Sequence, residues 1–280
     1  MKSIFVYTLL LVALLTSCEK RVNISLPYEG DKIVVNSLIQ PDSVIYIRVT
    51  RSVPSNVYDD SGFEEIKNAA VSIDQDGTPM PAPVQQVIKG QTFFVTAGKA
   101  ERGKKYTIRV ASGKLDPVTA GDTLPPAPAA SEPGAVRTSS RIRFTLDDNP
   151  GGKDYYRFRL FVCNDEMQPV SMRSFRLDPA FSNNLLDNNY TTSLIINDER
   201  FNGKRLLFVL ETQEPITSQY LMLEVSSLTH NSYQYFLTTR AQTINNGNII
   251  TEPVRVFTNV ERGYGIVAGI NMKRMVFRTE

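Results

Sequence analysis

The feature that most constrains the fold of this chain is the alternation of apolar and polar side chains in many short segments. In one of them, Ile45, Ile47 and Val49 alternate with more polar neighbours, and Tyr155–Cys163 repeats the pattern with larger side chains. Successive side chains of a strand point to opposite faces, so a period of two indicates strands with one buried face. Short strands separated by turn signals such as Asp76-Gly77 favour a β-sandwich.

The same pattern, with runs rich in Val and Ile, places strands along most of the chain. We expect them at 32–40, 44–51, 69–74, 91–96, 106–111, 141–146, 155–163, 193–197, 205–211, 220–225, 253–260, 264–271 and 273–278. One segment differs, because Tyr233, Phe236 and Leu237 recur at helical spacing after Thr229, a favourable N-cap residue. The sequence therefore predicts one short helix, near 230–242.

A proline-rich stretch interrupts the strands near the middle of the chain. Four prolines fall within 122–133, and proline stiffens an extended chain while donating no backbone hydrogen bond. We interpret this stretch as a boundary between two tandem Ig- or fibronectin-like β-sandwich domains; a long loop inside one sandwich is the alternative. The expected domains are an Ig-like sandwich at 32–124, a Pro-rich linker at 125–135 and a fibronectin-like domain at 136–280.

The N-terminus predicts export and lipidation. Lys2 is followed by a mostly apolar run, Ile4–Leu15, which is shorter than the ~20 residues of a membrane-spanning helix and typical of a signal peptide. The run ends in Leu15-Thr16-Ser17-Cys18, a bacterial lipobox, in which small residues before the cysteine admit the peptidase. We therefore expect a signal peptide at 1–17, a lipidated tether at 18–31 and membrane attachment through acylated Cys18.

Charge and residue counts exclude several functions. The net charge of +2 gives no electrostatic footprint for nucleic acid. His230 is the single histidine, which excludes a multi-histidine metal cluster and leaves one base for a triad; at a helix start we interpret it as a surface residue. Cys163, at a strand end opposite the apolar stripe, is interpreted as structural, a reactive thiol being the alternative if a base lies near. We predict no enzyme activity, no catalytic residue and no cofactor.

Two segments offer oxygen ligands of the kind that Ca²⁺ takes, Asp147-Asp148-Asn149 and Asn183–Asn189. Neither has the spacing of an EF-hand or of a Gly-Asp repeat, and turn chemistry accounts for both equally well. The sequence alone therefore assigns no metal ligand.

The remaining candidates are weaker. A hydrolytic carboxylate pair would need Glu64-Glu65 to approach Glu261 within about 5–10 Å, which sequence does not show. Gly263-Tyr264-Gly265 lacks the lysine of a phosphate-binding loop and is interpreted as a tight turn. Four tyrosine rings are suited either to stacking on sugars or peptides or to ordinary cross-strand packing: those of Tyr155, Tyr156, Tyr233 and Tyr235.

Several motifs follow Cys18. They are Leu26-Pro27, Lys32-Ile33-Val34-Val35, Val71-Ser72-Ile73, the run 197–204, Ser232-Tyr233-Gln234-Tyr235, Glu252-Pro253-Val254 and the run 258–266. In these motifs the chain resembles a Bacteroidota lipoprotein family, domain of unknown function 4249, over nearly the whole mature chain; Val267-Ala268-Gly269 departs from it where an aromatic is expected. The resemblance implies an outer-membrane lipoprotein that assists a TonB-dependent transporter, and it carries no catalytic residue.

We therefore expect an accessory or substrate-capturing lipoprotein partner of a TonB-dependent outer-membrane barrel. The loops around Pro54–Phe63 and Pro169–Tyr190 would face the ligand or the transporter, because binding residues usually lie on loops of a rigid scaffold. A structural or adhesive cell-surface protein with Ig-like modules is the alternative, and a hydrolase whose carboxylates converge only in the fold is a third. Lys20 is not followed by the acidic pair that surface-exported lipoproteins often carry at this position. The sequence therefore does not distinguish the periplasmic face of the outer membrane from its surface face.

Overall fold

The structure is a computed structural model. It describes residues 28–54, 63–178, 189–245 and 254–280. Contacts group the chain into two units, Met1–Gly30 with Val53–Asp60 and Asp31–Ser52 with Ser61–Glu280. Every strand and the helix described below lie in the second unit. The predicted signal peptide, Cys18 and most of the tether lie outside the described residues.

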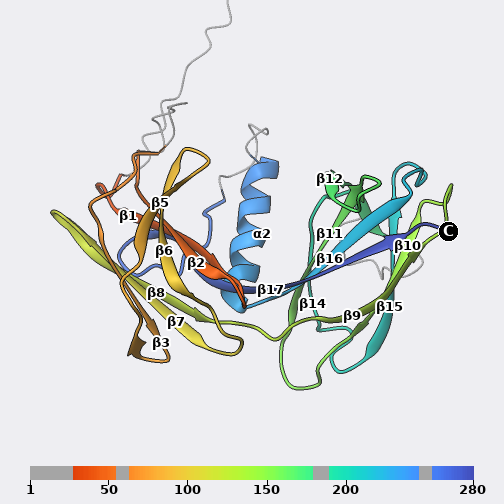
Figure 1. The fold of residues 1–280 in the computed structure, drawn as a ribbon, viewed down its shortest axis with the longest axis horizontal. Coiled ribbons are helices and arrows are strands. Elements are labelled where there is room, and N and C mark those ends of the chain that lie inside the picture. Colours follow the sequence, from red (N-terminus) through yellow and green to blue (C-terminus); the bar gives the residue numbers. More distant parts are fainter. Residues whose placement is uncertain (1–27, 55–62, 179–188, 246–253) are drawn as a thin grey trace, which may run out of the picture. The chain divides into compact units, whose positions relative to one another are not determined.

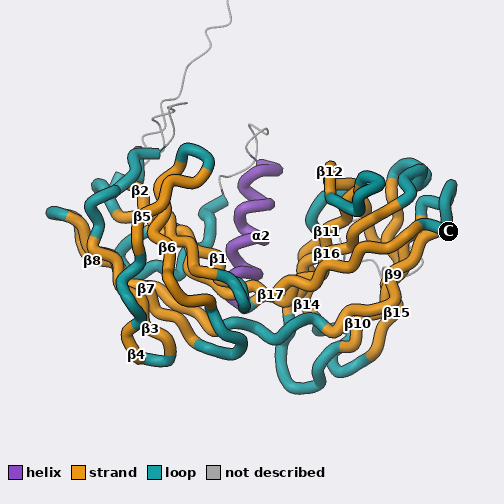
Figure 2. Tube along the Cα trace, in the orientation of Figure 1, coloured by secondary structure: helices purple, strands orange, loops and turns teal. Residues whose placement is uncertain are grey.

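The described chain is mostly β, as Figure 2 shows by colour. The strands are β1 (Ile33–Ile39), β2 (Val44–Arg51), β3 (Ala70–Gln75), β4 (Thr78–Pro79), β5 (Val84–Ile88), β6 (Gln91–Lys99), β7 (Lys105–Ser112), β8 (Leu115–Thr123), β9 (Ala129–Ala135), β10 (Arg141–Asp147), β11 (Tyr155–Cys163), β12 (Pro169–Arg173), β13 (Phe175–Leu177), β14 (Leu194–Asn197), β15 (Arg205–Thr212), β16 (Tyr220–Leu228) and β17 (Tyr264–Arg278). Among the described residues one helix, α2 (His230–Asn245), lies between β16 and β17 in the sequence (Figure 1).

The strands form three sheets. The largest has nine strands in the order β12-β11-β16-β17-β1-β2-β6-β5, with β14 also paired to β11. The other two have four strands each, β13-β15-β10-β9 and β4-β3-β7-β8. The long strand β17 joins the two parts of the large sheet, because residues 264–269 pair in parallel with β1 and residues 270–278 pair antiparallel with β16.

Each four-stranded sheet encloses its own apolar core with part of the large sheet. The β13-β15-β10-β9 sheet shares a core with β11, β14 and β16, where the rings of Phe144, Phe158 and Phe208 pack with centroids 5.1–5.3 Å apart. The β4-β3-β7-β8 sheet shares a second core with β1, β2 and β6, in which Ile47 and Tyr106 are fully buried. Two sheets packed over a common core are the arrangement of a β-sandwich, so the predicted fold class is confirmed.

Helix α2 covers a third, smaller core. Ile195, Leu228 and Ile270, from β14, β16 and β17, pack there beneath Phe236 and Leu237 of the helix. Because β16 has covered faces on both sides, nearly all its residues are buried.

The predicted N-cap of this helix is confirmed. The Thr229 hydroxyl accepts a hydrogen bond from the Ser232 amide at 3.2 Å, and the Ser232 hydroxyl accepts one from the Thr229 amide at 2.9 Å. This reciprocal pair satisfies two amides at the helix start. The helix begins at the predicted residue and extends three residues beyond the predicted end, to Asn245.

Several expected elements differ in the structure. The expected strand at 253–260 is absent from its described part, 254–260, and the two strands expected at 264–271 and 273–278 are the single strand β17. The Asn259 side chain explains the first difference, because its amide exchanges two hydrogen bonds with the Val267 backbone, at 2.8 and 3.1 Å, in place of main-chain pairing. The second difference arises because β17 pairs first with β1 and then, without interruption, with β16.

The proline-rich stretch also contains a strand. Ala129–Ala135, within the expected linker 125–135, is β9 and pairs with β10, although the register shifts at Glu132-Pro133, where Glu132 has a positive φ of 53°. An edge strand tolerates proline, because its outer backbone groups need no partner. The segment expected to be irregular, Pro169–Tyr190, likewise includes β12 and β13 in its described part. The division into domains stays a prediction.

No helix among the described residues is both long and apolar enough to cross a membrane.

Candidate functional site

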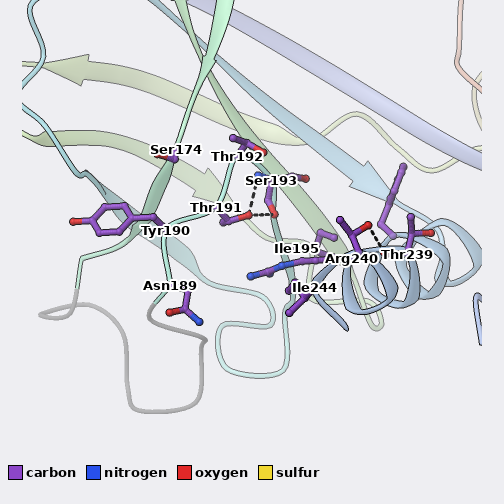
Figure 3. A pocket seen from close by; sticks show the side chains of 12 residues that line it. Ser174, Asn189, Tyr190, Thr191, Thr192, Ser193, Ile195, Thr239, Arg240 and Ile244 are labelled. Atoms are coloured by element: carbon purple, nitrogen blue, oxygen red, sulfur yellow. Dashed lines mark hydrogen bonds between the residues drawn. The ribbon is translucent and has the colours of Figure 1, made fainter. Parts of the chain in front are cut away.

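A pocket with a volume of about 630 Å³ lies beside the C-terminal half of α2. Its other wall is the segment 189–195, which leads into β14, together with Ser174 between β12 and β13. Figure 3 shows the Arg240 side chain extending from the helix toward the segment that carries Asn189 and Thr191. Asn189, Tyr190 and Ser174 belong to the predicted binding loop 169–190, whose residues 179–188 lie outside the described part.

Backbone pairing fixes the loop wall of the pocket. The Phe175 and Thr191 amides each donate to the other residue's carbonyl, at 2.9 and 2.8 Å. The Thr191 hydroxyl donates to the Ser193 carbonyl and accepts from the Ser193 amide, which holds the next turn (Figure 3). Tyr190 lies under the guanidinium of Arg176, 5.0 Å from the ring centroid. These contacts present the wall as a preformed surface.

The lining combines hydroxyl groups with apolar surface. Its hydroxyl-bearing residues, besides Tyr190, are Ser174, Thr191, Thr192, Ser193, Thr239 and Thr243. Phe236, Ile195 and Ile244 supply the apolar part, and Arg240 is the single charged residue of the lining as described. The Thr239 hydroxyl is shielded from solvent and has no hydrogen-bond partner within the described structure. Small-molecule sites combine apolar surface with placed polar groups, and this lining supplies both, with hydroxyl groups in the majority.

The described lining contains no carboxylate, histidine or cysteine. The groups that the lining does offer are hydroxyls, an amide and a guanidinium beside apolar surface, which can hold a polar ligand through hydrogen bonds.

His230 and Cys163 occupy the positions that were predicted for them. His230 is exposed at the start of α2, with Nδ1 3.2 Å from the Tyr155 hydroxyl. Cys163 is buried at the end of β11, where the pairing with β12 shifts, and burial raises the pKa of its thiol. A raised pKa disfavours the reactive thiolate, in keeping with a structural cysteine.

The acidic residues suggested for hydrolysis have separate partners. The Glu65 carboxylate accepts hydrogen bonds from the Thr92 amide and hydroxyl, at 2.8 and 2.7 Å, and these bonds lower the pKa of Glu65. Glu261 forms a single bridge to Thr119 of β8 through its backbone. Each residue thus has a role in strand pairing that explains its position.

The tyrosines singled out from the sequence do not line the pocket. Tyr156 is buried in the first core, and its hydroxyl donates to Asp148 at 2.6 Å. Tyr155 and Tyr233 pack against each other with ring centroids 4.3 Å apart. The aromatic residues that do line it, Tyr190 and Phe236, carry no distinguishing sequence motif, although Phe236 lies on the predicted helix.

The fold and the pocket define a class: a β-sandwich protein with a hydroxyl-rich pocket beside a short helix. The chain belongs to the family described as Domain of unknown function (DUF4249), whose model matches residues 19–275. A search of curated proteins finds no match.

Two solved structures show limited similarity. Trypsin-activated alpha-2-macroglobulin from Escherichia coli is 15% identical, with a TM-score of 0.24, over 75% of this chain and 15% of that one. Escherichia coli alpha-2-macroglobulin activated by porcine elastase is 13% identical, with a TM-score of 0.23, over 71% of this chain and 18% of that one. Similarity at this level assigns no function to the chain.

Proposed function

We propose that this protein is an outer-membrane lipoprotein, anchored by acylated Cys18, that captures a small polar ligand for a TonB-dependent transporter. The pocket beside α2 is the observation that carries the proposal, because it offers hydroxyls, one guanidinium and apolar surface on a fixed wall. A neutral or anionic ligand with several hydrogen-bonding groups matches that lining.

The anchor rests on the sequence. Leu15-Thr16-Ser17-Cys18 has the spacing of a lipobox after an apolar run. The family match begins at residue 19, directly after the predicted first residue of the mature chain. Stable attachment needs more than one acyl chain, which a triacylated Cys18 would provide.

The experiment is affinity purification of the lipidated protein from its own membrane in mild detergent, followed by mass spectrometry. We expect a TonB-dependent barrel to co-purify in near-stoichiometric amount. Recovery of the lipoprotein alone, under conditions that preserve known barrel complexes, would contradict the transport role. If the barrel does co-purify, its cargo is the first ligand to test against the pocket.

A second function, adhesion or surface structure, is favoured by the edges of the large sheet. The two end strands carry exposed apolar side chains, with Val87 of β5 72% exposed and Val170 of β12 62% exposed. Exposed strand edges with apolar side chains are sites for pairing with another chain. Deletion of the gene that leaves nutrient uptake intact but alters attachment would favour this second function.

A further inference from the structure

Three aspartates from two loops converge at one end of the first sandwich core. Asp148 and Asp154 lie in the connection between β10 and β11, and Asp198 directly follows β14. One carboxylate oxygen from each residue lies within 4.8 Å of the others. Asp148 is 8% exposed and Asp198 is 0% exposed, so two of the three negative charges are removed from water.

Asp198 is the feature that requires an explanation. In the described structure neither of its carboxylate oxygens has a hydrogen-bond partner, and both are shielded from solvent. A buried carboxylate is strongly unfavourable unless it is paired or coordinates a metal ion. Its side chain meets two further carboxylates, which makes the electrostatic cost larger still.

The surrounding groups hold the carboxylates in place without neutralising them. Asp148 accepts hydrogen bonds from the Tyr156 hydroxyl at 2.6 Å and from the Gly203 amide at 2.8 Å. The Asp198 amide donates to the Asp154 carbonyl at 3.0 Å, which ties the two loops together. The cluster is therefore built into the fold rather than formed by chance approach of surface side chains.

The basic side chains that flank the cluster in the sequence pair elsewhere. Lys153 binds Glu199 at 3.4 Å, and Arg205 lies 3.2 Å from Glu132. Within the described part of the chain, no lysine or arginine forms an ion pair with the three clustered aspartates.

We propose that Asp148, Asp154 and Asp198 bind a divalent cation, and that the cation is Ca²⁺. Calcium takes six to eight oxygen ligands at about 2.3–2.6 Å, so its ligand oxygens lie up to about 5 Å apart. The three oxygens lie within 4.8 Å of one another, which is inside this range. Mg²⁺ usually keeps several waters and is bound through one or two carboxylates, so three converging carboxylates favour Ca²⁺. Three carboxylates leave positions for water, which half-buried Asp154 admits.

The test is calcium titration of the full chain in mild detergent, after removal of metal with EDTA. Isothermal titration calorimetry with CaCl₂ alone should show one equivalent bound. At a free Ca²⁺ concentration 100 times the Kd, the midpoint of thermal unfolding should rise by about 5–10 °C. Binding does not depend on the proposed transport role, so either proposal can fail without the other.

Asp198→Asn tests the central ligand. It should weaken Ca²⁺ binding at least about tenfold, because affinity follows the number of charged ligands. Without calcium the variant should unfold at the same temperature as the unmodified protein or higher, since the amide replaces an unpartnered buried charge. This second measurement separates loss of the site from loss of the fold.

Glu199→Gln is the matched control, since Glu199 is an exposed neighbour that pairs with Lys153 outside the cluster. It should bind calcium as the unmodified protein does. The proposal is overturned if the unmodified protein shows no heat of binding and no thermal shift in about 1 mM CaCl₂, the weak end of protein calcium sites. Unchanged binding by Asp198→Asn, or tighter binding of MgCl₂ than of CaCl₂, overturns it as well.

Discussion

Two glycines explain how the run 258–266 leads the chain into β17. Gly265 has φ = +101° and lies against the backbone of Val35 in β1, where a Cβ atom would collide with the carbonyl oxygen. Gly263 makes a similar close approach to the Ile33 carbonyl. Only glycine combines this conformation with such proximity. The Gly-x-Gly turn thus allows β17 to enter the sheet beside β1, and the predicted tight turn has a structural reason.

Gly265→Ala is therefore expected to lower the free energy of unfolding by about 2–6 kcal/mol, the combined cost of backbone strain and overpacking. Urea unfolding followed by circular dichroism measures this loss. Gly113→Ala is the control, because Gly113 also has positive φ, +53°, but nothing lies within 4 Å of its Cβ position. Equal losses in the two variants would contradict a role for the contact with Val35.

At the scale of elements, a buried ion network joins three strands of the large sheet. Glu224 of β16 is 0% exposed and accepts hydrogen bonds from Arg159 of β11 at 2.8 Å and Arg274 of β17 at 3.0 Å. Arg157 lies 3.6 Å from the same carboxylate and 4.5 Å from the centroid of Phe236 in α2. Burial lowers the pKa of Arg157 to about 10, because a charged guanidinium is less favourable beneath the helix than in water.

Glu224→Ala should destabilise the protein by about 3–5 kcal/mol, because it leaves Arg157 buried without its carboxylate. Glu211→Ala removes a more exposed pair with Arg176, 2.9 Å apart on β15 and β13, and should cost about 0.2–1 kcal/mol. Chemical unfolding of both variants at neutral pH measures these two losses of unfolding free energy. A Glu224→Ala variant as stable as the Glu211→Ala variant would show that the network contributes little.

At the scale of the whole molecule, β17 contributes to all three cores. Val267 packs in the core beside β1, Ile270 lies beneath α2, and Met275 and Phe277 pack against the core of the β13-β15-β10-β9 sandwich. The final strand thus connects regions that the sequence suggested were separate domains. The proposed anchor concerns the other end of the chain, at Cys18.

Cys18→Ala should remove the membrane anchor without altering the sandwich cores. We expect the variant in the aqueous phase after detergent phase partition, whereas the unmodified protein enters the detergent phase. Mass spectrometry of the mature N-terminus should detect the acyl groups only when Cys18 is present. Cys163→Ala is the control, since Cys163 is buried in the fold and should leave partition unchanged. Detergent partition of Cys18→Ala equal to that of the unmodified protein would contradict lipidation.

The sequence predicts only some of the residues of each candidate site. Asp148 lies in a turn whose oxygen ligands the sequence indicates, whereas Asp154 belongs to no motif and Asp198 lies in a run that carries only the family resemblance. No local pattern joins the three, because about fifty residues separate the two loops that meet. The loop 169–190 was expected to bind, but not the helix wall that supplies Thr239 and Arg240. Ligand spacing in sequence is informative only when one element carries all the ligands.

By itself, the sequence determined the elements whose pattern is local. The period of two located β2 and β11 at their observed bounds, and Thr229 marked the start of α2. Tertiary structure alone decided that β17 continues past Asn271, that β9 forms despite its prolines, and which loops meet at the pocket and at the three aspartates. The physical reason is that side-chain periodicity reports which face of an element is buried, whereas pairing between distant segments depends on packing that no local pattern records.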